Sequence, residues 1–180
     1  MQRRIFGRTG IEVPPIALGG FPFGGVNRAI GWDPFTDAGQ QSGVATIRRA
    51  LERGITYFDT APSYGAGNSE CIFGEALQGQ RDSITLATKC PWNGDADSVL
   101  GSLEKSLARL RTDHVDILQL HGGMFTPDDV QHILDRGPRC WTQYRPVKWI
   151  CPRLKPFAPR KLRVARRATD RRVAELSCVS

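Results

Sequence analysis

The chain has 180 residues, a length typical of one domain with a sizeable core. Its net charge of +7 would suggest nucleic-acid binding if the charge were spread evenly. Residues 1–137, however, hold 13 Lys or Arg and 16 Asp or Glu, whereas residues 138–180 hold 12 Lys or Arg and 2 Asp or Glu. The body of the chain is therefore slightly acidic, and its composition does not indicate a nucleic-acid-binding domain.

Residues 1–53 predict a hairpin, a strand, a long loop and a helix. The hairpin spans residues 1–13, with a turn at Gly7-Arg8-Thr9-Gly10. Residues 16–18 form a strand that ends at Gly19-Gly20, and residues 21–40 show no periodicity, as expected of a loop. The helix spans residues 41–53 and places Val44, Ile47 and Leu51 on one face.

Three strands, each followed by a helix, make up the rest of the body. The strand at 55–59 precedes a short helix that Asn68 or Ser69 caps and that ends near Gly79. The strand at 84–89 precedes a helix that Asp97 caps. The inward face of this second helix consists of Leu100, Leu103, Leu107 and Leu110. The strand at 115–120 precedes a helix over residues 126–137.

Strands that alternate with helices of this size indicate a parallel α/β sheet. The strands near residues 16, 55, 84 and 115 account for four β/α units. A complete (β/α)₈ TIM barrel has eight such units in about 250 residues. We therefore expect an α/β fold of the (β/α)₈ TIM-barrel type, truncated to about four units over residues 1–137. An N-terminal hairpin precedes these units, and an irregular basic tail over residues 138–180 follows them.

Four polar residues lie at or just after the ends of three consecutive predicted strands. Asp59, Lys89 and His121 each close a strand, and Tyr64 lies in the loop after Asp59. Each residue alone has an ordinary structural explanation. In a barrel of parallel strands, however, these ends open on the same face, where catalysis takes place. We therefore expect the four residues together to form a catalytic site.

These side-chain types fit the reduction of a carbonyl group. The reaction needs a hydride at carbon, which a nicotinamide cofactor supplies, and a proton at oxygen, which Tyr64 can donate. Lys89 is expected to lower the pKa of the Tyr64 phenol, because a nearby ammonium favours the phenolate. Asp59 keeps Lys89 charged and in position, and His121 orients the carbonyl group.

The motifs that carry these residues resemble those of the aldo-keto reductase superfamily. The similar motifs are the Arg4-x-x-Gly-Arg-Thr-Gly start, the Gly19-Gly20 strand end, the run from Gly54 to Gly65 with Ser69-Glu70 and Gly74, the Thr88-Lys89-Cys90 strand, and the segment from Ser102 to His121. They occur in order over residues 3–137, which makes the resemblance specific. The Gly19-Gly20 strand end and the long first loop look most like the aldose-dehydrogenase-like branch.

The resemblance implies an NADP-dependent oxidoreductase that interconverts a carbonyl and an alcohol in a small molecule or a sugar. The implied cofactor is NADPH, bound by Gly20, Phe21 and Asp59. The implied substrate pocket is lined by Tyr64, Trp92 and His121. The family usually places its pyrophosphate and adenine contacts on strands seven and eight, whereas the elements predicted here end with the fourth unit. We therefore expect the activity and the NADPH binding of this chain to be impaired.

Residues 138–180 break the pattern of strands and helices. Prolines at 138, 146, 152, 156 and 159 interrupt any regular element, and residues 160–172 are almost purely basic. One hypothesis is that a frameshift or a misassembled gene produced a disordered tail, which the coding DNA would test. An alternative is a non-catalytic fragment whose basic tail binds nucleic acid or another acidic partner, with nucleic acid the less favoured partner.

The sequence also predicts where the chain acts and what else it binds. It carries no signal peptide and no apolar run near the ~18 residues of a membrane span, so we expect a cytoplasmic protein without membrane contact. His114, His121 and His132 lack the spacing of metal ligands, so no metal is expected. A half barrel leaves two open sheet edges, which favour self-association, and a homodimer would rebuild a closed site.

Overall fold

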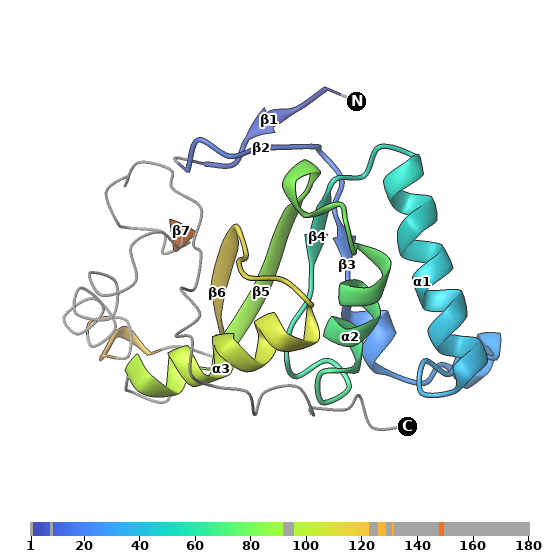
Figure 1. Ribbon diagram of the computed structural model, residues 1–180. Helices are drawn as coiled ribbons and strands as arrows, with labels where there is room; N and C mark the ends of the chain where they lie inside the picture. Colours follow the sequence, from blue (N-terminus) through green and yellow to red (C-terminus); the bar gives the residue numbers. More distant parts are fainter. Residues whose placement is uncertain are drawn as a thin grey trace, which may run out of the picture.

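The computed structural model describes residues 2–7, 9–91, 96–122, 126–128, 131 and 148–149 (Figure 1). Its strands are β1 (Arg4–Ile5), β2 (Glu12–Val13), β3 (Leu18–Gly19), β4 (Tyr57–Asp59), β5 (Thr85–Pro91), β6 (Ile117–His121) and β7 (Lys148–Trp149). Its helices are α1 (Asp37–Glu52), α2 (Asn68–Ala76) and α3 (Ala96–Arg109), with 3₁₀ helices η1 (Phe21–Gly24), η2 (Arg28–Ile30) and η3 (Arg81–Ser83). Strands β3 to β7 pair in chain order, all in parallel, as the alternation of strands and helices predicts.

The N-terminal hairpin of β1 and β2 lies across one end of the parallel sheet (Figure 1). The Phe6 ring meets the Tyr57 ring edge-on at 5.9 Å, and Arg3 donates a hydrogen bond to the Thr56 hydroxyl. Thr56 and Tyr57 lie at the start of β4, so the hairpin covers the amino-terminal end of this strand. The carboxyl ends of the parallel strands lie at the opposite end of the sheet.

Alternation along the strands separates a core face from a second face of the sheet. Phe58, Leu86 and Leu118 belong to the apolar cluster that also contains side chains of α1, α2 and α3. Asp59 in β4 and Lys89 in β5 lie at the opposite parity, and their side chains meet on the other face. The period of two in each strand therefore places the polar residues away from the helix-packed core.

Helix α1 begins at Asp37, four residues before the predicted start, so the predicted loop over 21–40 is wrong at its end. The Thr36 hydroxyl accepts a hydrogen bond from the backbone N–H of Gly39 at 3.1 Å and caps the helix. Asp37 in the first turn complements the helix dipole. These two short-range signals start a helix before its apolar periodicity becomes visible.

Helix α2 is not capped by Asn68 or Ser69, so that prediction is wrong. The N-cap is Gly67, whose φ of +100° a residue with a side chain rarely adopts. Asn68 instead donates hydrogen bonds to the backbone carbonyls of Phe23 and Pro34, and Ser69 donates one to the carbonyl of Gly20. Both side chains therefore hold the segment after β3 against α2, and the helix ends at Ala76 instead of near residue 79.

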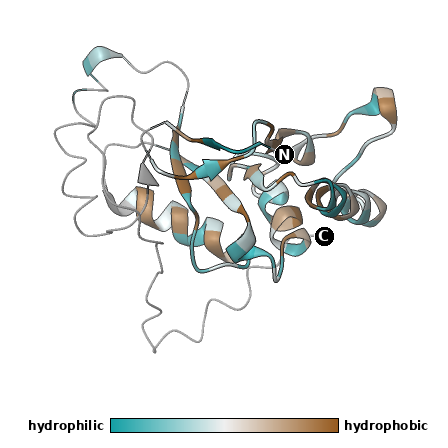
Figure 2. Ribbon diagram, turned by 90° about the horizontal axis from the view of Figure 1, so that it is seen from above, coloured by the Kyte–Doolittle hydropathy of each residue, from teal (hydrophilic) through white to brown (hydrophobic). Residues whose placement is uncertain are grey.

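Helix α3 begins at Ala96 and already includes Asp97, so the predicted cap at Asp97 is also wrong. The apolar stripe along the helix is visible in Figure 2 as bands of opposite hydropathy. Its buried residues are Val99, Leu103 and Leu107, followed by Leu110 just after the helix. The predicted Leu100 is only partly buried, because Val99 takes the inward position in the first described turn.

The C-terminal predictions lie largely outside the described residues. Residues 127, 128 and 131 are helical, as predicted, but the rest of the helix over 126–137 is not described. Of the predicted tail, only β7 is described, and it pairs in parallel with β6. The tail's conformation and the domain boundary at residue 137 therefore stay predictions. Within the described part of the chain, no helix has the length and apolar character to cross a membrane.

Candidate active site

Asp59 and Lys89 form an ion pair at the carboxyl ends of β4 and β5. The Lys89 ammonium donates to Asp59 Oδ2 at 2.7 Å and to the backbone carbonyl of Thr60 at 2.8 Å. Asp59 is in register with Ala87, so the long lysine side chain reaches from two residues further along β5. Lys89 is only 8% exposed, and a buried ammonium needs such partners to stay charged.

Tyr64 and His121 join this ion pair. The Lys89 ammonium lies 5.0 Å from the centroid of the Tyr64 ring. The Tyr64 and His121 rings meet edge-on, with their centroids 5.7 Å apart. The structure therefore brings together all four residues that the sequence predicted. Three come from strands β4, β5 and β6, and Tyr64 comes from the loop after β4.

Two polar residues that the sequence did not predict complete the cluster. Gln119 donates to Asp59 Oδ1 at 3.2 Å, so both carboxylate oxygens of Asp59 are bound. The Ser63 hydroxyl lies 3.2 Å from Nδ1 of His121. Gln119 is a lone polar residue between Leu118 and Leu120, two positions before His121, and that spacing placed it on the same face.

His121 lies between groups of opposite charge. Partial burial lowers the pKa of its imidazole below the ordinary 6.5, and the positive charge of Lys89 lowers it further. The negative charge of Asp59 opposes this shift without reversing it. The imidazole is therefore neutral at pH 7, and in that form it has one donor and one acceptor nitrogen.

Tyr57 is a second tyrosine near Asp59, but its environment differs from that of Tyr64. Burial, and secondarily the negative charge of Asp59, raise the pKa of Tyr57 to about 12. Tyr57 lies in β4 two residues before Asp59, against the hairpin, and among the residues that the structure describes no ammonium lies over its ring. The Tyr57 hydroxyl therefore stays protonated at neutral pH.

The residues predicted to line a cofactor differ in how accessible they are. Phe21 is 73% exposed, and its ring meets the edge of the Tyr64 ring at 5.4 Å. Gly20 is buried, and its backbone N–H donates to the carbonyl of Asp59 at 2.6 Å. A Cβ at Gly20 would lie 2.7 Å from Ser69 Oγ and 2.8 Å from Thr60 Oγ1. Trp92, the predicted pocket wall, lies outside the described residues.

The loop that carries Tyr64 packs tightly against η1. A Cβ on Gly24 would lie 2.4 Å from the carbonyl carbon of Tyr64 and 2.6 Å from the nitrogen of Gly65, so only glycine allows this approach. The Tyr64 backbone N–H also donates to the carbonyl of Ala61, and its carbonyl accepts from the N–H of Ser69. The Tyr64 backbone is therefore held from both sides.

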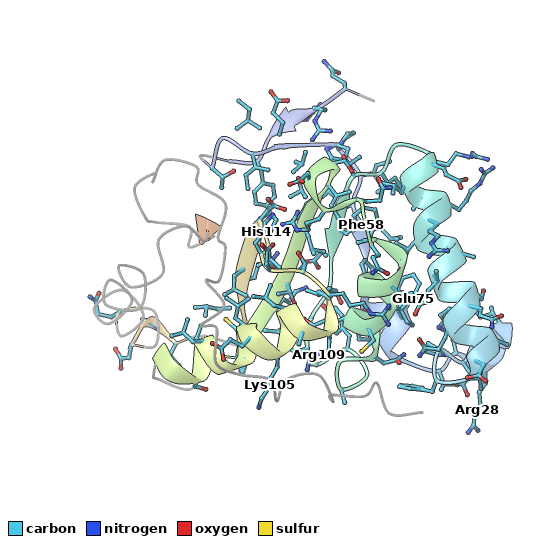
Figure 3. The ribbon with its side chains drawn as sticks, viewed as in Figure 1. Arg28, Phe58, Glu75, Lys105, Arg109 and His114 are labelled. Atoms are coloured by element: carbon cyan, nitrogen blue, oxygen red, sulfur yellow. The ribbon has the colours of Figure 1, made fainter. Side chains whose placement is uncertain are left out.

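A buried ion pair lies behind the site, on the helix side of the sheet. Glu70 of α2 is fully buried and accepts hydrogen bonds from Arg109 of α3 at 2.6–2.7 Å. Its other oxygen accepts from the Thr88 hydroxyl at 2.6 Å, next to Lys89 in β5. Figure 3 shows Arg109 between α3 and α2, and Glu70 connects Arg109 to Thr88 of β5.

Comparison with known proteins gives consistent matches over the body of the chain. A family model described as the aldo/keto reductase family matches residues 15–134. Aldo-keto reductase YhdN of Bacillus subtilis is 40% identical over 124 residues, which are 63% of this chain and 35% of that protein. L-galactose dehydrogenase of Arabidopsis thaliana is 36% identical over 129 residues, 67% of this chain and 38% of that protein. The chain thus spans little more than a third of the length of these curated relatives.

Solved structures match the fold as well. An aldo/keto reductase from Klebsiella pneumoniae in complex with NADP and acetate is 30% identical, with a TM-score of 0.56, over 71% of this chain and 43% of that one. Another from Klebsiella pneumoniae, in complex with NADPH, is 28% identical, with a TM-score of 0.59, over 77% and 47%. These neighbours are (β/α)₈ barrels, which confirms the expected TIM-barrel type with about half of its units in this chain.

Proposed function

Because the chain belongs to the aldo/keto reductase family, we propose that its site interconverts a carbonyl and an alcohol with NADPH as cofactor. The observation that carries this proposal is the arrangement around Tyr64. The ion pair of Lys89 and Asp59 lies beneath the Tyr64 ring, and His121 meets the edge of that ring. A phenol, an ammonium and an imidazole are thereby positioned around one point at the carboxyl ends of the strands.

The proposed reduction balances as one hydride and one proton added to the carbonyl group. When bound, NADPH would supply the hydride to the carbonyl carbon and would be released as NADP⁺. Tyr64 donates its hydroxyl proton to the carbonyl oxygen, which gives the alcohol and leaves a phenolate. The Lys89 ammonium stabilises that phenolate electrostatically, and Asp59 holds the ammonium in place. His121 orients the carbonyl oxygen toward Tyr64.

The residues present fit part of a dinucleotide cofactor. The exposed Phe21 ring, at the same end of the sheet as Tyr64, offers an apolar face to a nicotinamide. The Asp59 side chain is 27% exposed, and a carboxylate has room for further donors, such as a ribose hydroxyl. Gly20 contributes close packing between β3 and α2 and has no free N–H to offer.

We infer that the substrates are small carbonyl compounds or sugars. The relatives with specific names include the L-galactose dehydrogenase and a methylglyoxal reductase, YeaE, of Escherichia coli, which is 40% identical over 92 residues. An L-glyceraldehyde 3-phosphate reductase of Escherichia coli is 32% identical over 137 residues. Each of these three names refers to a short carbonyl compound or a sugar. A proton donor at the exposed end of the strands is accessible to such small molecules.

The test is an NADPH titration of the purified chain followed by turnover of a small aldehyde. We expect the chain to quench NADPH fluorescence and to oxidise NADPH when the aldehyde is added. The Tyr64→Phe variant should still quench NADPH but should lose about 10²–10⁴-fold in turnover, the usual contribution of a positioned acid. A wild-type chain that neither binds nor oxidises NADPH would contradict the proposal for this chain, and weak binding would support the predicted impairment.

The Tyr57→Phe variant is the matched control. Tyr57 lies two residues before Asp59 in the same strand, but burial keeps its hydroxyl protonated. We expect this variant to retain wild-type turnover within a few-fold, because it removes a hydroxyl that takes no part in proton transfer. Equal losses in both tyrosine variants would show that turnover follows stability and not the identity of the acid.

A further inference from the structure

The imidazole of His121 is held by a hydroxyl from the loop that carries the proposed acid. Ser63 Oγ lies 3.2 Å from His121 Nδ1, although the two residues are 58 positions apart in the chain. Ser63 directly precedes Tyr64, whose ring edge meets the His121 ring. One loop between β4 and α2 therefore positions the phenol and contacts the imidazole.

The groups that face His121 keep its ring neutral, so the position of its single proton matters. Partial burial and the charge of Lys89 of β5 disfavour a second proton, and Asp59 of β4 favours one. In a neutral imidazole, the hydrogen bond at one nitrogen decides whether the other nitrogen is a donor or an acceptor. The bond to Ser63 is on Nδ1, which leaves Nε2 for a substrate.

We propose that Ser63 is a positioning residue that donates its hydroxyl proton to Nδ1 and so keeps the His121 proton on Nε2. This inference rests on the proposed function, because a carbonyl oxygen is an acceptor and requires a donor nitrogen beside it. The opposite arrangement, with Nδ1–H donating to Ser63, would leave a lone pair on Nε2. That lone pair would repel a carbonyl oxygen.

The backbone around Ser63 is held firmly enough for such a role. Gly24 approaches the Tyr64 backbone more closely than any Cβ would allow, and Tyr64 is bound through both its N–H and its carbonyl. The Ser63 side chain itself is exposed, so water competes for its hydroxyl. A measurement of the tautomer therefore distinguishes a real constraint from an incidental contact.

The experiment is NMR of the ring nitrogens in the full chain labelled with ¹⁵N-histidine. Above the titration range of His121, we expect the wild-type chemical shifts of the Nε2–H tautomer. Ser63→Ala should move the shifts toward a mixture of tautomers, and Ser63→Thr, which keeps the hydroxyl, should restore them. Ser83→Ala is the matched control, because it removes an exposed hydroxyl near the start of β5 whose hydrogen bonds within the described residues go to Gln80. A wild-type Nδ1–H tautomer, or no change in Ser63→Ala, would overturn the inference.

This readout needs neither cofactor nor turnover, so it separates the inference from the proposed function. Nε2–H shifts without any NADPH oxidation would contradict the function and leave the role of Ser63 in the tautomer standing. If the chain turns over, Ser63→Ala should lower kcat/KM for the aldehyde about five- to tenfold, the worth of one neutral hydrogen bond. NADPH binding should not change, because the Ser63 hydroxyl contacts His121 and not the cofactor residues.

Discussion

His121 illustrates how single residues at this site depend on their neighbours. Its ring is only partly buried, yet burial and the Lys89 charge together outweigh the attraction of Asp59 for a proton. The pKa of Tyr57 shifts upward instead, to about 12, because burial and the negative charge of Asp59 both disfavour the phenolate. Burial is therefore the main cause of both pKa shifts, and the charges of Asp59 and Lys89 modify them.

The lowered pKa of His121 predicts a pH dependence of stability. Between its folded-state pKa and the ordinary 6.5, the unfolded chain binds more protons, so stability falls as the pH decreases through this window. We expect the His121→Gln variant to lack this part of the loss. Urea unfolding of both proteins at pH values from about 7.5 down to about 5, on both sides of the ordinary histidine pKa of about 6.5, checks this. An NMR titration midpoint above about 6.5 for His121 would contradict it.

At the scale of elements, a glycine and an asparagine join the segment after β3 to helix α2 and to the loop that precedes it. Gly24 at the end of η1 lies against the loop of Tyr64, and Asn68 at the start of α2 binds the carbonyls of Phe23 and Pro34. The segment after β3 is therefore packed onto α2, although the sequence shows it as a loop without periodicity. This packing holds Tyr64 and Phe21 in contact.

The Gly24→Ala substitution should disturb the position of Tyr64. The new Cβ would lie 2.4 Å from the Tyr64 carbonyl carbon, so the backbone must shift. We expect a loss of about 1–3 kcal/mol in the free energy of unfolding, as for other overpacked sites. Gly25→Ala is the control, because a Cβ there meets no atom within 4 Å. Equal losses in the two variants, measured by urea unfolding, would show that chain flexibility and not the contact causes the effect.

Glu70 should be the costliest carboxylate to neutralise in the helix layer. Glu70→Gln leaves the Arg109 guanidinium without its buried partner, and such a loss costs about 3 kcal/mol or more. Glu75→Gln is the matched control in the same helix, because Glu75 forms a longer ion pair with Arg111 at 3.6 Å with both side chains about half exposed. An exposed pair contributes below about 1 kcal/mol. Urea unfolding of both variants tests this difference.

At the scale of the whole molecule, the sheet is an open part of a barrel. Within the described residues, β3 pairs with β4 on one side and forms the edge of the five-stranded sheet on the other. An unpaired edge presents backbone donors and acceptors to other chains. We therefore propose that the chain self-associates through this edge, as the sequence predicted for open barrel edges.

Sedimentation at increasing protein concentration tests this self-association. We expect the average mass to rise with concentration for the wild type and to rise less for Gly19→Lys. Gly19 lies in β3, and a Cβ there meets no atom within 4 Å, so lysine adds a charge to the edge without a steric clash. A monomeric wild type at all concentrations, or an unchanged Gly19→Lys variant, would contradict the role of this edge.

The sequence by itself determined the order of strands and helices and the four residues at the strand ends. Both follow from periodicity, because a period of two defines each strand and its faces, and the final residue of each strand lies at the same end of a parallel sheet. The spacing of Asp59, Lys89 and His121 therefore predicted a shared site before any contact was known. The family prediction had a different basis, because it came from the resemblance of the motifs around these residues to those of the aldo-keto reductases.

Only the tertiary structure decided which other side chains support that site. Gln119 meets Asp59 across 60 positions and Ser63 meets His121 across 58, and no local pattern relates residues so far apart. The sequence around Asn68 and Ser69 predicts helix caps, but both residues lie inside the helix and donate hydrogen bonds to carbonyls of the packed segment after β3. Side-chain hydrogen bonds depend on which backbones are brought together, and that is set by packing and not by local sequence.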